Sequence, residues 1–134
     1  MKKILMGLGV LGSVLFAAPI DEYMKTLEVE AKAADSSFTG FSAKRGEAIF
    51  LSKHIGKRGK EVSCASCHTN NLNQAGENIF TGKTIEALSP KANPQRLTKV
   101  SKVKKWLRRN FNDVYKHEGS AQQKGDVLTY IRNF

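Results

Sequence analysis

The chain has 134 residues but only two cysteines and one tryptophan. A zinc ribbon would need a second pair of Cys or His ligands, and the chain has no further cysteine. The formal net charge is +10, yet the single tryptophan and the absence of any RNA- or DNA-binding motif argue against a nucleic-acid partner. The basic surface is therefore expected to face an acidic protein or an anionic membrane.

Residues 1–18 have the pattern of a secretory signal peptide. Two lysines are followed by an apolar stretch over residues 4–16 and by two alanines that lead into polar sequence. The apolar stretch is short for a transmembrane helix, and no later run is long enough to cross a membrane. The pattern predicts a periplasmic protein, which an uncleaved signal would instead anchor to the membrane.

The rest of the chain predicts a small all-α fold. Apolar residues recur at steps of three and four beside helix-capping residues, which indicates helices at 21–34, 43–52, about 99–111 and 121–133. No segment has the alternation of a convincing strand. Residues 69–93 form a long polar segment, which we expect to wrap a ligand. We expect a helical prefix or spacer at 19–37 and one domain at 38–134.

The two cysteines belong to the sequence Cys64-Ala65-Ser66-Cys67-His68, the attachment signature of a c-type haem. Two thiols one helical turn apart can form thioethers with two vinyl groups on one edge of the porphyrin. The imidazole of His68 then lies under the ring as the proximal iron ligand. A disulfide would not need His68, and a thioredoxin-like motif would need a βαβ setting. The prediction is one covalent haem c.

The residue pattern leaves the distal iron ligand open. Electron-transfer cytochromes commonly use Met, but the last methionine of this chain is Met24, far ahead of the motif. The alternatives are Asn110, His117 or no protein ligand, with His54 a weaker fourth. Asn110 falls on the inward stripe of its predicted helix, although an Asn near a helix end can also serve as a C-cap. For both histidines the simpler interpretation is a solvent-exposed side chain.

The helical frame resembles the class I cytochromes c, in which Gly46 with Phe50 and Tyr130 would form the crossing of the first and last helices. Over residues 38–134 the chain resembles more closely the sphaeroides haem protein family, the asparagine-ligated, oxygen-binding monohaem cytochromes c. The matching stretches are Gly40 to Gly46, Cys64 to Thr69, Thr81 to Ile85, Leu88 to Pro90, Asn93 to Thr98, Val103 to Asn110 and Lys124 to Val127.

The resemblance implies that the amide oxygen of Asn110 is the sixth ligand of ferric iron. Trp106, which is close to Asn110 in the sequence, is expected to pack on the haem. An amide oxygen is a hard, weak ligand that suits ferric better than ferrous iron. Reduction would then release it and open a site for dioxygen, nitric oxide or carbon monoxide. The family has a disulfide after this Asn, but Phe111 and Gly119 occupy the two positions here. The less constrained loop keeps His117 open as a ligand.

We therefore expect a monohaem c-type cytochrome that takes part in periplasmic electron transfer and binds a diatomic gas when reduced. The resemblance implies a redox partner such as a dihaem cytochrome c or a membrane cytochrome b, docked on the basic side of the helix at 99–111. That basic side could equally be a solvated helix face. One alternative function is a plain low-spin carrier with His68 and His117 as ligands. Another is a haem enzyme that reduces a small oxidant, which ranks last because no distal acid–base pair is recognisable.

Overall fold

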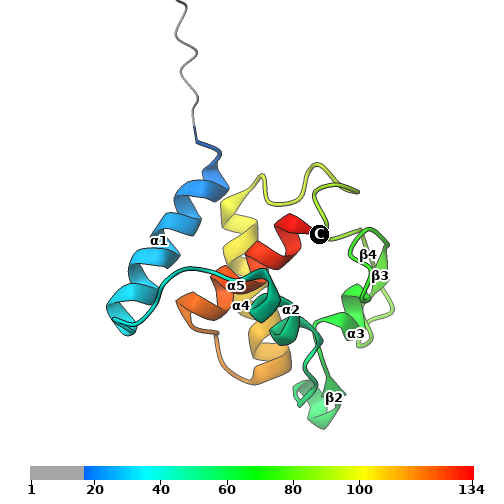
Figure 1. Cartoon of the computed structure of the whole chain (residues 1–134). Helices are drawn as coiled ribbons and strands as arrows, with labels where there is room; N and C mark the ends of the chain where they lie inside the picture. The colour runs from blue at the N-terminus through cyan, green and yellow to red at the C-terminus, as the bar shows by residue number, and fades with distance from the viewer. Residues whose placement is uncertain (1–16) are drawn as a thin grey trace, which may run out of the picture.

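The computed structural model describes residues 17–134, so the predicted signal segment lies outside the described residues except for its last two. The described part is mainly helical (Figure 1), which confirms the predicted fold class. Its helices are α1 (Pro19–Ala34), α2 (Ala43–Leu51), α3 (Ala65–His68), α4 (Val100–Tyr115) and α5 (Ala121–Asn133), with a 3-10 turn η1 at Lys57–Gly59. Among these residues no helix is long and apolar enough to cross a membrane.

The ends of the helices follow local sequence chemistry. Ser42 caps α2 by accepting a hydrogen bond from the Arg45 amide at 3.2 Å, as its sequence predicts. At the start of α5, Ser120 and Gln123 form a reciprocal capping box. Helix α4 starts without a side-chain cap: the sequence offers Thr98 or Ser101 for that role, but Lys99 holds the cap position, and the Thr98 hydroxyl donates to the Gln95 carbonyl.

Two short hairpins correct the expectation of no strand. Strand β1 (His54–Ile55) pairs antiparallel with β2 (Glu61–Val62), and β3 (Gly76–Glu77) pairs antiparallel with β4 (Thr84–Ile85). Each strand has two residues, which is too short for an alternating apolar pattern to show in the sequence. The second hairpin holds part of the long polar segment in place.

Helices α2 and α5 cross at close range. A Cβ atom at Gly46 would lie 2.0 Å from the Asp126 carbonyl oxygen, so only glycine fits at the crossing. The Asp126 side chain is 1% exposed and accepts hydrogen bonds from the Arg45 guanidinium at 2.8 and 2.9 Å and from the Ser42 amide at 2.7 Å. Phe50 and Tyr130 meet beside the crossing, with ring centroids 5.5 Å apart.

Helix α1 packs against α5 and, to a lesser extent, α4. Its buried stripe consists of Ile20, Tyr23, Leu27 and Ala31, at steps of three and four. An ion pair of 2.6 Å between Asp21 and Arg132 joins its first turn to the end of α5. Residues 19–34 are therefore packed on the rest of the chain rather than extended away from it.

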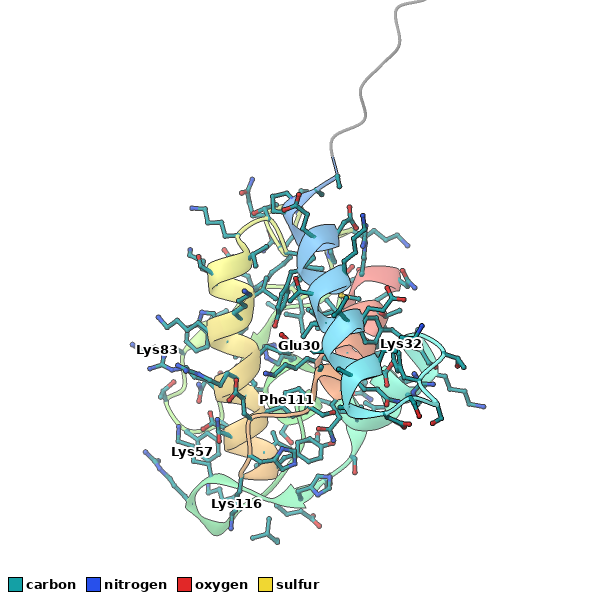
Figure 2. All side chains as sticks on the ribbon, turned by 90° about the vertical axis from the view of Figure 1, so that its left-hand side faces the viewer. Glu30, Lys32, Lys57, Lys83, Phe111 and Lys116 are labelled. Carbon is teal, nitrogen blue, oxygen red and sulfur yellow. The ribbon has the colours of Figure 1, made fainter. Side chains whose placement is uncertain are left out.

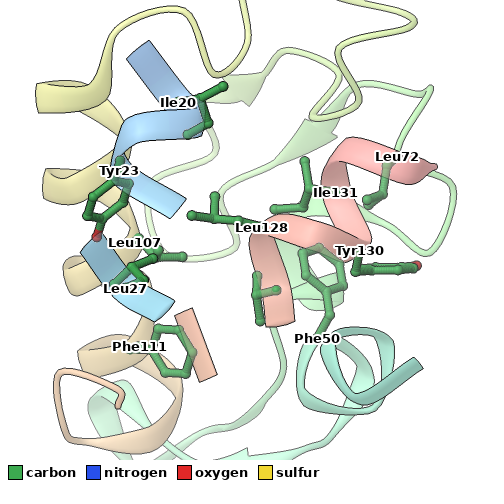
Figure 3. Packing of buried hydrophobic residues seen from close by; sticks show 11 residues of the cluster. Ile20, Tyr23, Leu27, Phe50, Leu72, Leu107, Phe111, Leu128, Tyr130 and Ile131 are labelled. Atoms are coloured by element: carbon green, nitrogen blue, oxygen red, sulfur yellow. The ribbon is translucent and has the colours of Figure 1, made fainter. Parts of the chain in front are cut away.

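The apolar core lies where α1, α2, α4 and α5 meet (Figure 3), and it includes Leu107 and Phe111 from α4. Helix α3 and the β3–β4 hairpin lie on the far side of this core from α1 (Figure 1). The side of α4 that carries Leu107 therefore faces inward, in the direction of the Cys64–His68 turn.

Candidate functional site

The Cys64–His68 segment forms a tight helical turn, as predicted. The amides of Cys67 and His68 both donate to the Cys64 carbonyl, at 3.2 and 3.1 Å. The turn ends at Thr69, whose φ of 65° redirects the chain. The two cysteines are not joined by a disulfide, and their one-turn separation places them on neighbouring positions of one helical surface.

Two cavities flank this turn, of about 440 and 570 Å3. The two cavities share six lining residues, which come from three separate parts of the chain: Cys64, His68, Leu88, Arg96, Trp106 and Asn110. The first cavity extends to the apolar core, and the second extends to the β3–β4 hairpin and the residues around it. Together they provide a large space between α3 and α4, suited to a flat apolar cofactor.

The His68 imidazole faces this space without a partner. Its Nδ1 is buried and has no hydrogen bond within the described part of the chain. Burial, and to a smaller extent the nearby Arg96 guanidinium, lowers the pKa of His68 to about 4. The ring is therefore neutral at physiological pH, and a neutral imidazole is the form that binds a metal. An orphaned buried nitrogen beside an apolar space fits a metal-containing cofactor.

Asn110 is half-buried on α4 and lines both cavities, as His68 does. The helix continues to Tyr115, four residues beyond the predicted end at 111. Asn110 therefore lies inside the helix, which excludes the C-cap interpretation; Lys116 is the C-cap. Asn110 belongs to α4 and His68 to α3, so the two side chains reach the same space from different helices.

The two other candidate ligands, His54 and His117, lie outside both cavities. Their rings flank Tyr115, with centroids 4.2 and 5.8 Å from its ring. The His117 Nδ1 accepts a hydrogen bond of 3.0 Å from the Gly119 amide, and the His54 Nε2 lies 2.9 Å from the Ser52 hydroxyl. The structure thus brings Asn110 together with His68 and does not bring either histidine to that space.

Trp106 also lines both cavities, but half of its surface is exposed (50%). The Lys105 ammonium and the Arg109 guanidinium lie 5.5 and 5.3 Å from its ring centroid, close enough for cation–π contacts. Trp106 is therefore placed at the rim of the space, with one face available to a planar group inside it.

Sequence reasoning missed Arg96 as a site residue. Its guanidinium donates to the carbonyls of Ala87 and Glu86, at 2.9 and 2.8 Å, and also lines both cavities. These bonds fix the loop before α4 and leave a cation beside the space, where it can pair with a carboxylate of a cofactor. The Asn93 to Thr98 stretch of the family resemblance contained the residue, but nothing in its spacing marked the contact.

The chain matches known proteins over most of its length. Residues 36–131 match the model of a domain of unknown function, DUF1924. Cytochrome c'' of Methylophilus methylotrophus is 36% identical over 101 residues, which are 75% of this chain and 70% of the relative. The cytochrome c-type protein SHP of Cereibacter sphaeroides is 39% identical over 89 residues, 66% of this chain and 68% of the relative.

Solved structures of the same two relatives share this fold. Oxidized SHP, described as an oxygen binding cytochrome c, superposes with a TM-score of 0.75 and 33% identity, covering 86% of this chain and 96% of SHP. The solution structure of cytochrome c'', which addresses haem-ligand detachment in that protein, gives a TM-score of 0.73 and 32% identity over 84% of this chain and 90% of its own.

Proposed function

Because the chain belongs to the DUF1924 family and is a monohaem c-type cytochrome with one covalent haem c, as SHP and cytochrome c'' are, we propose that it works in electron transfer and that its ferrous form binds a diatomic gas. When bound, the haem would supply a one-electron couple and an iron able to take ligands from the protein. Side chains of this chain would hold the group and its iron.

In this proposal Cys64 and Cys67 hold the group covalently and His68 fills the proximal position. The one-turn spacing of the two thiols and the neutral, unpartnered imidazole support these roles. Covalent attachment keeps the cofactor in a small domain whose own apolar core is limited. Arg96 would pair with a cofactor carboxylate, and Trp106 would cover the rim.

Asn110 would supply a second ligand to the iron of the bound group in its ferric state. The observation that carries this role is that Asn110 and His68 line the same space from opposite helices, whereas both histidine alternatives lie outside it. The amide oxygen of Asn110 is a hard donor that holds ferric iron better than ferrous iron. Reduction would weaken the hold of this amide on the iron, so that the ferrous group could bind dioxygen or nitric oxide.

Bis-histidine ligation through His117 is the less supported alternative. It would require the turn after α4 to break the hydrogen bond between His117 and Gly119 and to move the imidazole around Tyr115. A haem enzyme is a weaker proposal as well, because the two carboxylates that line the cavities are engaged elsewhere, Glu86 with the Asn93 amide and Asp113 with the Lys57 ammonium.

The partner would be an acidic redox protein such as a dihaem cytochrome c or a membrane cytochrome b. Exposed basic side chains of and beside α4 surround the exposed edge of Trp106: Lys99, Lys102, Lys105 and Arg109. Like-signed charges around the rim would steer an acidic partner to the edge of the cofactor. A reduction rate that does not change with ionic strength would remove this part of the proposal.

We also place the protein in the periplasm, on the pattern of residues 1–18. Covalent attachment through two thiols requires that they stay free of other partners, and the described chain offers no third cysteine to compete. Fractionation of cells that express the full chain would test the compartment.

The deciding experiment is the optical spectrum of the reduced protein before and after addition of carbon monoxide. We expect a high-spin ferrous spectrum that shifts when the gas is added. Asn110→Ala should change the ferric spectrum while leaving the gas-bound ferrous spectrum intact, and His117→Ala, the matched control, should change neither. A low-spin ferrous spectrum that ignores the gas, lost in the His117 variant, would instead establish the plain electron carrier.

A further inference from the structure

A third cavity, a polar crevice of about 410 Å3, lies between α1 and α4 and shares no lining residue with the two cavities around His68. Figure 2 looks onto this face, with Glu30 on the side of α1 that faces α4. We propose that the crevice binds a phosphate group, as the free ion or as the headgroup of a lipid. This function is independent of the gas binding proposed above.

Basic side chains from two helices converge on the crevice. Lys104, Lys105 and Arg108 reach it from α4, and Lys124 reaches it from α5. Lys104 and Arg108 are one helical turn apart and so lie on the same face of α4. The Lys124 side chain is only 16% exposed, so its ammonium is held inside the crevice rather than in open solvent.

Two carboxylates also line the crevice, and they do not balance the cations. Glu118 is engaged with the Lys124 ammonium at 3.1 Å. Glu30 is then left to face the three basic side chains of α4. Lys104, Arg108 and Lys124 outnumber these two carboxylates, and Lys105 at the rim adds a further cation, so the crevice carries an excess of positive charge that attracts an anionic phosphate group.

Other features of the crevice would orient the bound phosphate group. The Tyr23 ring lies under the Lys104 ammonium, 4.8 Å from it, and fixes the lysine over the floor of the crevice. The guanidinium of Arg108 offers a planar pair of N–H donors that matches two oxygens of a phosphate. Lys105 leans to the opposite side, over Trp106, so Lys104 and Arg108 are the principal contacts.

The test is calorimetric titration of the haem-loaded ferric protein with inorganic phosphate in a chloride buffer. We expect saturation with one phosphate per chain. The double variant Lys104→Gln with Arg108→Gln should weaken binding roughly tenfold or more, since it removes charge-assisted hydrogen bonds. The matched control, Lys44→Gln with Lys91→Gln, removes two exposed cations that line none of the three cavities described above and should leave the affinity unchanged.

A second variant is expected to strengthen phosphate binding rather than weaken it. Glu30→Gln removes a carboxylate that competes with the ligand, so it should strengthen binding roughly twofold to fivefold. Its control, Glu28→Gln, is exposed on the same helix and does not line the crevice. If both glutamate variants strengthen binding equally, the effect comes from net charge, and the crevice is not the site.

Vesicles of phosphatidylcholine with and without phosphatidic acid distinguish the two sources of the phosphate group. Saturable binding of the free ion identifies a soluble ligand. Binding only to the vesicles with phosphatidic acid, lost in the Lys104 and Arg108 variant and kept in its control, identifies a lipid headgroup. The proposal is overturned if neither probe binds, or if the crevice variant and its control lose affinity equally.

Discussion

The ring of Phe111 covers the backbone of Gly119, so closely that a Cβ atom on the glycine would lie 2.8 Å from the ring atom Cγ. Phe111 is 3% exposed, and the His117 ring lies stacked 6.4 Å from it. The family resemblance implies a disulfide between these two positions. In this chain a non-covalent contact of a ring on a glycine joins α4 to the segment before α5.

Gly119→Ala should therefore lower the free energy of unfolding by about 2 kcal/mol or more. The substitution combines the strain of a side chain at φ +85° with a clash against the Phe111 ring. Gly59→Ala is the control, because Gly59 has a φ of +67° with open space around it and should cost only about 1 kcal/mol. Equal losses in denaturant unfolding would show that the ring contact adds nothing.

Gly46→Ala should be among the most damaging single substitutions. Its Cβ would lie 2.0 Å from the Asp126 carbonyl oxygen, and a backbone atom in a helix cannot move aside as a side chain can. We expect a loss of about 2–4 kcal/mol as the two helices are forced apart. Lys44→Ala, on the exposed side of the same helix, should stay within about 0.5 kcal/mol. A thermal midpoint that is equal for the two variants would contradict the close crossing.

Lys116→Gly should stabilise the protein by about 1 kcal/mol. Lys116 ends α4 in the left-handed region, with a φ of 59° and a ψ of 21°, where a side chain is strained and glycine is not. The same exchange at Lys25, exposed inside α1, should instead destabilise by about 1 kcal/mol. Opposite signs for the two variants in chemical denaturation are the expected result, and a loss at both positions would refute it.

Alkaline pH should destabilise the fold through its tyrosines. The phenol pKa values of Tyr23, Tyr115 and Tyr130 are all raised, in each case first by burial. The folded chain therefore keeps protons that the unfolded chain gives up above the ordinary pKa of about 10. The free energy of unfolding is unaffected below that pH and falls as the pH rises through the raised values.

Tyr115→Phe isolates one of these groups. The Tyr115 hydroxyl donates to the Ile49 carbonyl at 2.6 Å, so the variant should lose about 1 kcal/mol at neutral pH. Its stability should then fall less steeply above pH 10 than that of the parent, because fewer raised phenols remain to ionise. Unfolding curves at several pH values, with tyrosinate absorbance as an independent titration, would measure both effects. An unchanged slope would mean that Tyr115 titrates normally.

Local chemistry made much of this site predictable. Cys64, Cys67 and His68 share one turn by their spacing alone, and Ser42 marked the start of α2. The crossing at Gly46 was expected only from the resemblance to class I cytochromes c. The inward position of Asn110 followed from helical periodicity before the structure placed it beside the cavities. These features depend on residues within one or two helical turns of each other.

Contacts between distant segments were not predictable. The sequence left His117 open as a ligand because its position depends on how the turn after α4 folds over Tyr115 and Gly119. Arg96 reaches the cavities because its guanidinium is held by two backbone carbonyls, nine and ten residues earlier in the chain. Helix α4 runs to Tyr115 rather than to 111, and Val114 in the added turn is buried against the rest of the chain.

The ion pair between Arg45 and Asp126 joins residues 81 positions apart in the chain, and it also sets an order of events. Contacts between such distant segments form late, after the whole intervening chain has been delivered. The cysteine turn lies inside that interval and can be exposed on an open chain until the last helix arrives. Covalent attachment is therefore expected to come first and closure of the α2–α5 crossing second. A chain truncated before α5 should still be a substrate for attachment, but it should not acquire the native fold.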